Sequence, residues 1–385
     1  MAQAEQSSMP EASWSSPPAP PTGTTVFNWG SYCFDTCLVQ KSGLLFLSCF
    51  GFFKSILSCF GIDFNCLIPN NCSEEREKKY PPKEILIVHP IKSGTYPVLL
   101  FFPGTSLVNS FYSQLFKHIS SHGFIVVSPQ LYGLIPPPAC VELNSAESVA
   151  DWLLKYGLDG HLPGGVKPDF SSGLALAGHS RGGRTAFALA DKRAAYSAKN
   201  DAASGIHSRL LTKSGSSDAL NLSVLIGVDP VAACMCCASM PVVNPETDFF
   251  EFDVPVAVIG SGLGGDCAPK SGNYAQFFKR SKPPKRVEFL APQYGHMDVL
   301  DDNPAGDGSC FSCVSALMSK CMCQNAKGRS RDCMSRTVGG IAVAFFRAYN
   351  KTSPDTADLD AIVNNPGLAP AELVIPNPDQ VAGQS

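Results

Sequence analysis

The chain has 385 residues, a length that fits one α/β domain with appendages as well as two smaller domains. Its 30 Lys and Arg residues nearly balance its 33 Asp and Glu residues, so the net charge of −3 provides no basic surface for nucleic acid. Hydrophobic residues make up 44% of the chain, which excludes wholesale disorder, and the 33 Gly and 31 Pro residues argue against long helical bundles.

The N-terminal segment, residues 1–24, consists mainly of Ser, Pro, Ala and Thr and is predicted to be disordered. The first thirty residues contain no Lys or Arg and no apolar run, so they match neither a secretory signal nor a basic transit peptide. We expect residues 25–80 to form an N-terminal region that precedes a catalytic domain over residues 81–353.

Residues 43–68 form an apolar, cysteine-containing insertion in which only Lys54 and Asp63 are charged. The pentad LSCFG occurs in it twice, at 47–51 and 57–61. A buried hairpin or apolar insertion is the first interpretation, and peripheral contact with a membrane surface is the second. A spanning helix ranks last, because Lys54 would lie in the middle of the segment.

From residue 84 onward, short apolar runs alternate with amphipathic segments. The runs predict strands at 84–90, 97–104, 124–130, 173–180, 222–230, 255–264 and 285–290, and the segments predict helices at 109–123, 145–158, 181–195 and 336–350. This alternation predicts the α/β class, with a mostly parallel sheet whose chemistry lies at the carboxyl ends of the strands. The Pro-rich segment 354–385 is expected to be loosely held.

A G-x-S-x-G motif spans Gly178 to Gly182, between an apolar strand and a helix. In this setting the motif is typical of a nucleophile elbow, a sharp turn that raises a serine hydroxyl above the edge of the sheet. Gly178 and Gly182 lack the Cβ atoms that would clash with the helix start and the neighbouring strand. Ser180 is therefore the candidate nucleophile.

A serine hydroxyl needs a general base, and with this elbow the order along the chain is Ser, acid, His. Only His207 and His296 follow Ser180, and His207 lies in a polar stretch rich in Ser and Gly. His296 follows the strand at 285–290, whose carboxyl end meets the same edge of the sheet. We therefore expect His296 to be the base.

Two carboxylates compete for the role of the acid. Asp229 ends the strand at 222–230, and Asp266 follows the strand at 255–264. Pro230 fixes the turn after Asp229, which favours a rigidly held carboxylate there. Asp266 lies in a glycine-rich loop and stays open as the alternative.

An oxyanion hole combines the amide after the nucleophile with an amide from the loop that follows an early strand. The first of these belongs to Arg181. The second belongs to Gly104 or Thr105, because Pro103 has no N–H.

The 16 cysteines are expected to be mostly reduced, because no secretory signal is readable. Several of them gather near the C-terminal end, with a C-x-C pair that chelates zinc poorly and no His nearby. We therefore expect thiols there, and neither a metal nor another cofactor. These cysteines are Cys310, Cys313, Cys321, Cys323 and Cys333.

Six segments, in order, resemble the chlorophyllases of plants and green algae. They lie at 109–132, 178–183, 225–231, 256–264, 294–302 and 336–349. The similarity extends from about residue 25 to residue 374 and is interrupted at residues 39–80. It implies an α/β-hydrolase fold and hydrolysis of the phytyl ester of chlorophyll, a step of chlorophyll catabolism, to chlorophyllide and phytol.

The resemblance also implies roles for residues of this chain: Ser180 as nucleophile, Asp229 as acid and His296 as base. It thereby favours Asp229 over Asp266 and makes the protein a serine esterase of the chloroplast, with the cytoplasm or another endomembrane surface as alternative locations. A general carboxylesterase or lipase is the alternative substrate class. A catalytically idle pigment- or lipid-binding relative is the alternative outside enzymes, but it would not need all three residues.

Overall fold

The structure is a computed structural model and describes residues 25–39, 80–133, 136–199, 221–232, 249–304, 310–321 and 323–376. The segments 1–24 and 43–68 and His207 lie outside these residues, so the expectations for them stay predictions.

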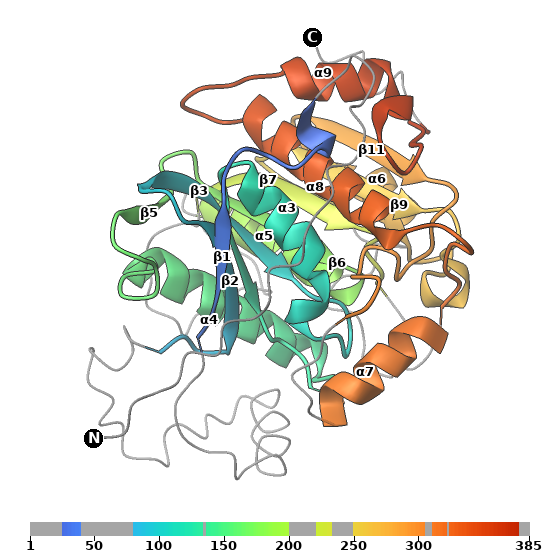
Figure 1. The fold of residues 1–385 in the computed structure, drawn as a ribbon, viewed down its shortest axis with the longest axis horizontal. Helices are drawn as coiled ribbons and strands as arrows, with labels where there is room; N and C mark the ends of the chain where they lie inside the picture. Colours follow the sequence, from blue (N-terminus) through green and yellow to red (C-terminus); the bar gives the residue numbers. More distant parts are fainter. Residues whose placement is uncertain are drawn as a thin grey trace.

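A nine-stranded sheet forms the centre of the described part of the chain (Figure 1). Its strand order is β1-β2-β4-β3-β6-β7-β9-β11, and β5 pairs with β3. The β1–β2 and β2–β4 pairs are antiparallel and the other pairs are parallel, which confirms the predicted α/β class. The strands are β1 (Phe34–Val39), β2 (Ile85–Pro90), β3 (Gly94–Phe102), β4 (Ile125–Pro129), β5 (Val166–Asp169), β6 (Leu174–His179), β7 (Leu222–Val228), β9 (Val256–Ser261) and β11 (Arg286–Ala291). The short strands β8 (Phe250–Glu251) and β10 (Ser281–Lys282) pair with each other.

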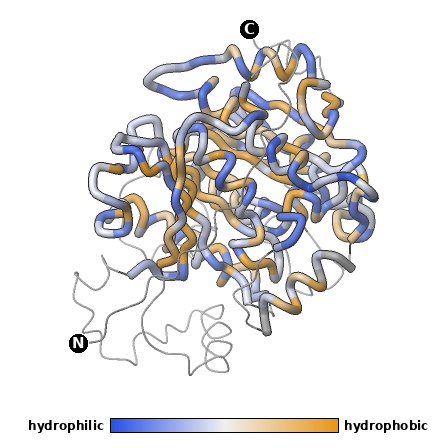
Figure 2. Tube along the Cα trace, in the orientation of Figure 1, coloured by the Kyte–Doolittle hydropathy of each residue, from blue (hydrophilic) through white to orange (hydrophobic). Residues whose placement is uncertain are grey.

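Helices cover both faces of this sheet. The helices α3 (Ser113–Ser121) and α8 (Arg331–Ala348) share one core with the sheet, and α4 (Ala139–Tyr156), α5 (Arg181–Lys199) and α6 (Tyr274–Arg280) share the other. Figure 2 shows apolar chain gathered in the central strands and hydrophilic chain in the outer loops. The remaining helical elements are η1 (Thr25–Phe27), η3 (Asn109–Tyr112), η5 (Gly265–Cys267), α7 (Cys310–Cys321), α9 (Ala357–Asn364) and η6 (Pro366–Leu368).

Strand β3 shows why its residues form a central strand. Leu99 and Phe101 pack into the core beneath α3 and α8, while Leu100 and Phe102 pack into the core beneath α4 and α5. Successive side chains of a strand point to opposite faces, so an apolar run without alternation fills both cores at once.

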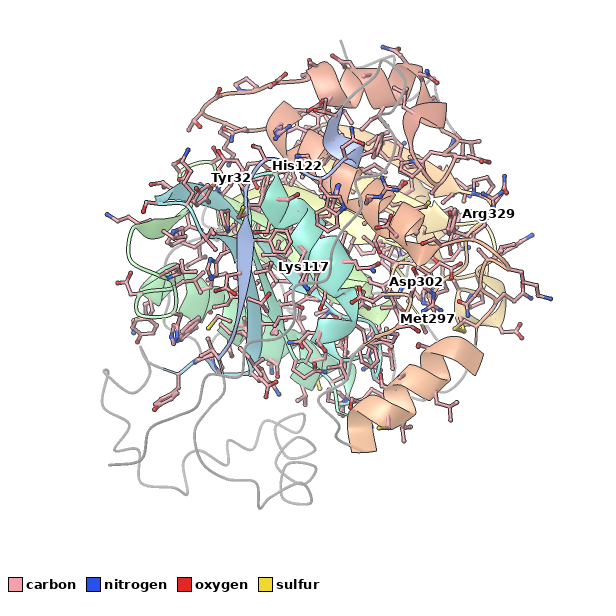
Figure 3. All side chains as sticks on the ribbon, in the orientation of Figure 1. Tyr32, Lys117, His122, Met297, Asp302 and Arg329 are labelled. Atoms are coloured by element: carbon pink, nitrogen blue, oxygen red, sulfur yellow. A yellow bond between two sulfur atoms is a disulfide. The ribbon has the colours of Figure 1, made fainter. Side chains whose placement is uncertain are left out.

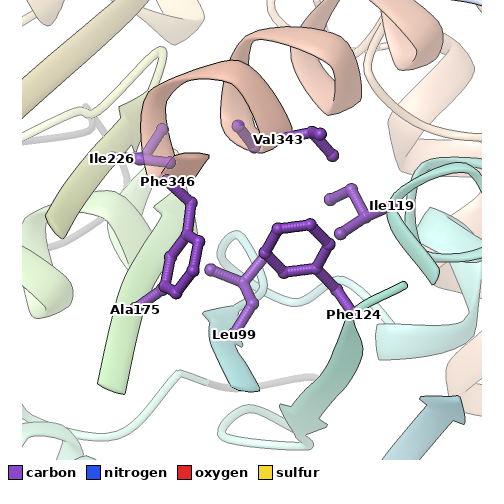
Figure 4. A pocket seen from close by; sticks show the side chains of 8 residues that line it. Leu99, Ile119, Phe124, Ala175, Ile226, Val343 and Phe346 are labelled. Carbon is purple, nitrogen blue, oxygen red and sulfur yellow. The ribbon is translucent and has the colours of Figure 1, made fainter. Parts of the chain in front are cut away.

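A small void lies in the first core, between the sheet, α3 and α8 (Figure 4). Its volume is about 10 Å³, roughly the room for one water, and all of its lining is apolar. A water there would find no hydrogen-bond partner, so the void is a packing defect of the core. Its lining consists of Leu99, Ile119, Phe124, Ala175, Ile226, Ala342, Val343 and Phe346.

The C-terminal segment differs from the expectation of a loosely held tail. Residues 354–376 include α9, and Ile362 and Leu373 are buried in the core shared with α8. The backbone of Val374 exchanges two 2.9 Å hydrogen bonds with Leu290 of β11. Leu and Ile side chains among the prolines thus hold this segment against the domain.

Further elements differ from the sequence predictions, which included neither β1, β5 nor α6. Helix α4 begins at Ala139 rather than at residue 145, directly after Pro138, which serves as the N-cap residue. The cysteines near the C-terminal end lie partly on α7, a helix that the sequence did not predict. Cys323 forms a disulfide with Cys267, so the expectation of free thiols was wrong for these two residues.

Candidate active site

The turn from β6 into α5 holds Ser180 in the left-handed backbone region, with φ of 55°. A Cβ on Gly178 would run into the backbone of Gly182, and a Cβ on Gly182 would run into the carbonyl oxygens of Phe102 and Pro103. Only glycine fits either place. The packing that the motif predicts is thus present, and it places the hydroxyl at the start of a helix above the sheet.

The structure brings Ser180, Asp229 and His296 together. Nε2 of His296 lies 2.8 Å from Oγ of Ser180, and Nδ1 of His296 lies 2.7 Å from Oδ2 of Asp229. All three residues are buried, with exposed fractions of 8%, 1% and 2% respectively. The three side chains therefore form one continuous hydrogen-bonded chain, in which the histidine can take the serine proton.

The three residues follow β6, β7 and β11, and backbone hydrogen bonds join the ends of these strands through β9, whose following residue Gly262 donates to the carbonyl of Ala291 at 2.9 Å. The amide of Ser180 donates to the carbonyl of Val228 at 3.0 Å, and the amide of Asp229 donates to the carbonyl of Ile259 at 2.6 Å. Asp229 has φ of 39°, which turns the chain sharply at the end of β7. Parallel strands thus deliver their carboxyl ends, and the side chains that follow them, to one edge.

Asp229, not Asp266, lies against the histidine. Asp266 is exposed in η5 and makes no hydrogen bond with His296 in the part of the chain that the structure describes. Oδ2 of Asp229 also accepts a hydrogen bond from the hydroxyl of Ser261, the last residue of β9. Oδ1 of Asp229 is buried without a hydrogen-bond partner among the described residues.

The loop after β3 lies against the nucleophile, because a Cβ on Gly104 would be 3.2 Å from Cβ of Ser180. The amide of Gly104 donates to the hydroxyl of Tyr112 at 2.9 Å, so its only proton is engaged. This removes Gly104 from the candidate oxyanion donors. The amide of Thr105 has no hydrogen-bond partner among the described residues, and Arg181 is the first residue of α5.

Comparison with known proteins identifies the family. The family model for chlorophyllase matches residues 62–378. Chlorophyllase-1, chloroplastic, of Citrus unshiu is 42% identical over 300 residues, which cover 76% of this chain and 80% of the relative. Chlorophyllase-2 of Arabidopsis thaliana is 39% identical over 285 residues, with 71% and 80% covered. The chain belongs to the chlorophyllase family. It is accordingly a hydrolase, and its α/β architecture is that of the family's α/β-hydrolase fold.

In this chlorophyllase family member, a buried ionic cluster supports the elbow from behind. Oε2 of Glu142, on α4, lies 2.6 Å from Nε of Arg181 and 3.1 Å from an Nη atom of Arg184. Oε1 of Glu142 accepts hydrogen bonds from the hydroxyls of Tyr132 and Thr185. The carboxylate is fully enclosed, and every partner is a donor, which is what a buried charge requires.

The loop that carries His296 is held by Asp298. Oδ2 of Asp298 accepts the amides of Gly295 and Ala326, both at 2.7 Å, and Oδ1 lies 3.3 Å from Nε of Arg331. Figure 3 marks the loop by the labels of Met297 and Asp302, near α7 in that view. The carboxylate thus ties the loop to the start of α8.

Ser261 and Glu142 are among the groups of this site that were not predicted from the sequence. Ser261 ends a strand at the catalytic edge, so its position gave a usable signal. Glu142 lies 39 residues before Arg181 on a helix, and no local pattern marks it.

Neither metal binding nor membrane spanning has a structural signature in the described ranges. They contain no group of three or more His, Cys, Asp or Glu residues placed to hold a metal ion. None of the helices described is both long and apolar enough to cross a membrane.

Proposed function

We propose that this protein hydrolyses the phytyl ester of chlorophyll, giving chlorophyllide and phytol, with Ser180 as nucleophile, His296 as base and Asp229 as acid. The observation that supports the triad is the hydrogen-bonded chain from Ser180 through His296 to Asp229, at 2.8 and 2.7 Å. The substrate rests on the chlorophyllase family and on the names of the relatives.

In the first step, His296 takes the proton of Ser180 while Oγ attacks the ester carbonyl. The charge of Asp229, whose Oδ2 lies 2.7 Å from Nδ1 of His296, stabilises the imidazolium that forms. The amides of Arg181 and Thr105 stabilise the oxyanion of the tetrahedral intermediate. His296 then gives its proton to the leaving oxygen, and phytol departs.

In the second step, water attacks the acyl-enzyme. His296 takes a proton from the water, and as the second tetrahedral intermediate collapses it gives that proton to Oγ of Ser180, which releases chlorophyllide and restores the serine hydroxyl. No cofactor enters either step, since every proton transfer passes through His296.

We further propose a chloroplast location, as the name of the Citrus relatives indicates for them, and peripheral membrane contact through residues 43–68. Deletion of 43–68 is expected to lower sedimentation with lipid vesicles and to leave hydrolysis of a soluble aryl ester nearly intact. Aggregation of the deletion variant, or loss of its activity on both chlorophyll and the aryl ester, would instead mean that the segment packs into the domain.

The proposed function is tested by incubating the purified protein and its Ser180→Ala variant with chlorophyll and with a short-chain aryl ester. Wild type should release water-soluble chlorophyllide, and the variant should be inactive on both substrates with an unchanged circular dichroism spectrum. Cleavage of the aryl ester alone would indicate a general carboxylesterase. Pigment binding without any cleavage would indicate an idle relative.

A further inference from the structure

His179 is a fully buried histidine directly before the candidate nucleophile, and the proposed mechanism does not use it. Its Nε2 lies 2.9 Å from the backbone carbonyl of His296, and its Nδ1 lies 2.7 Å from the hydroxyl of Tyr112. The hydroxyl of Tyr112 accepts the amide proton of Gly104 at 2.9 Å. Four residues from three separate stretches of the sequence are thus joined in one hydrogen-bonded chain.

The chemistry of the two ends fixes the direction of every bond in this chain. The amide of Gly104 can only donate, and the carbonyl of His296 can only accept. Nε2 of His179 therefore carries a proton, and in a neutral ring Nδ1 accepts the proton of the Tyr112 hydroxyl. Each donor and each acceptor is then used, which is how buried polar groups are accommodated at low energetic cost.

The surroundings keep both side chains of this chain uncharged. Burial lowers the pKa of His179 well below its usual value, and the neighbouring His296 lowers it further. Burial also raises the pKa of Tyr112 above its usual value. A neutral His179 matters because its ring centroid lies 4.7 Å from that of His296, which becomes a cation when it takes the serine proton.

We propose that His179 and Tyr112 are positioning residues, which hold the backbone of His296 and the loop at Gly104 in register with Ser180. This inference rests on the proposed function. The two side chains touch no reacting atom. His179 fixes the position of the His296 backbone, because it donates to the carbonyl of that residue. Tyr112 binds both His179 and the amide of Gly104, and so holds the loop that carries Thr105 against His179. A displacement of about 1 Å in such a site costs on the order of 100-fold in rate.

The inference is tested by replacing His179 with Leu, next to a matched control, His118→Leu. His118 is also a fully buried histidine whose Nε2 bonds a backbone carbonyl, that of Asn28, at 3.0 Å, but it lies outside the site. Both variants should unfold at a lower temperature than wild type. Below that temperature, His179→Leu should lose about 10- to 100-fold in kcat with KM within about twofold, while His118→Leu keeps both.

A second readout is the rate at which a fluorophosphonate labels Ser180, which reports on the nucleophile and base without chlorophyll. It should fall in parallel with kcat in His179→Leu. If the wild-type protein is labelled at Ser180 but does not cleave chlorophyll, the proposed substrate is refuted. The labelling rates of the variants then still measure the positioning effect. Equal labelling of folded His179→Leu and His118→Leu would overturn the positioning role, as would an absence of labelling in wild type.

Two conservative variants cover the case in which His179→Leu does not fold. The amide of His179→Gln reaches the position of Nε2 and can donate to the carbonyl of His296, whereas that of His179→Asn reaches the position of Nδ1 and can accept from Tyr112. The Gln variant should label at least about tenfold faster than the Asn variant, because only it keeps the bond to the base. Equal rates would contradict the inference.

Discussion

Oε2 of Glu142 accepts a 2.6 Å hydrogen bond from Nε of Arg181, which joins α4 to the residue directly after Ser180. The buried side chain of Arg181 reaches this carboxylate and, at 2.6 Å, the backbone carbonyl of Pro137. The first turn of α5 is therefore clamped to α4, and the strained backbone at Ser180 is held in place by its neighbour.

We expect Glu142→Gln to destabilise the protein strongly, by about 3–5 kcal/mol, because it removes the carboxylate charge that pairs with the buried guanidinium groups of Arg181 and Arg184. Thermal unfolding measures the loss. Glu147→Gln, a half-buried position on the same helix, serves as the control and should lower the unfolding temperature much less. Similar losses in the two variants would mean that the ion pair is not what holds α4.

Asp229→Asn is expected to lower kcat by about 10⁴-fold, because an amide favours the wrong tautomer of His296. Asp266→Asn is the matched control, because Asp266 follows the carboxyl end of the neighbouring strand β9 but is exposed. It should retain most of the activity. Steady-state hydrolysis of an aryl ester by both variants measures the difference, and the reverse ranking would assign the acid to Asp266.

Ser261→Ala removes one of the two donors that share Oδ2 of Asp229. Among the described residues, His296 is then the one side chain that still binds the carboxylate, so kcat should fall about tenfold, which corresponds to about 1.4 kcal/mol in activation free energy. Ser281→Ala is the control, because Ser281 is equally buried but its hydroxyl donates to the carbonyl of Phe277. A loss of stability in both variants without a difference in kcat would refute an orienting role.

Burial lowers the pKa of His118 from 6.5 to about 3, with His122 and Arg336 contributing to the shift. Between these two pH values the unfolded chain binds a proton that the folded protein does not. The free energy of unfolding should therefore fall as the pH decreases from 6.5 to about 3, by at most about 1.4 kcal/mol per pH unit from this group. The wild-type protein should lose this stability as the pH falls, whereas His118→Gln has no imidazole to protonate. The difference in the free energy of unfolding between the two, measured with urea, should therefore narrow toward acidic pH. A constant difference would contradict the shift.

Val343→Ile adds one methylene group to the lining of the apolar void between the sheet, α3 and α8. We expect a gain of up to about 0.8 kcal/mol in stability, visible as a higher unfolding temperature. Val338→Ile is the control, since Val338 is buried on the same helix but does not line the void. It should be neutral or destabilising, because a filled core resists an added methylene.

The sequence alone determined the features that depend on neighbouring residues. The apolar runs predict the strands, and the two glycines around Ser180 predict the elbow, since both reflect sterics within a few residues. Helix α7 was not predicted, because its sequence is rich in Cys and Ser, which have only moderate helix propensity. Helix α4 was predicted six residues short, because the proline that precedes it at 138 was not used as a start signal.

Only the tertiary structure decided which polar groups meet. Asp229 and Asp266 follow neighbouring strands, β7 and β9, and sequence spacing does not say which carboxylate reaches His296. The φ of 39° at Asp229 turns its side chain toward the histidine, whereas Asp266 lies further along the chain, in an exposed helical turn. The amide of Gly104, equally available in the sequence, is occupied by Tyr112 in the fold.

The same holds for the pairings across long stretches of chain. Cys267 and Cys323 are 56 residues apart, and Glu142 and Arg181 are 39 residues apart. Whether such groups bond depends on distances of a few ångströms, and these are set by how the elements that carry them pack. A sequence pattern specifies which elements form. The position of one side chain relative to another depends on all the contacts between those elements, and therefore on the three-dimensional packing.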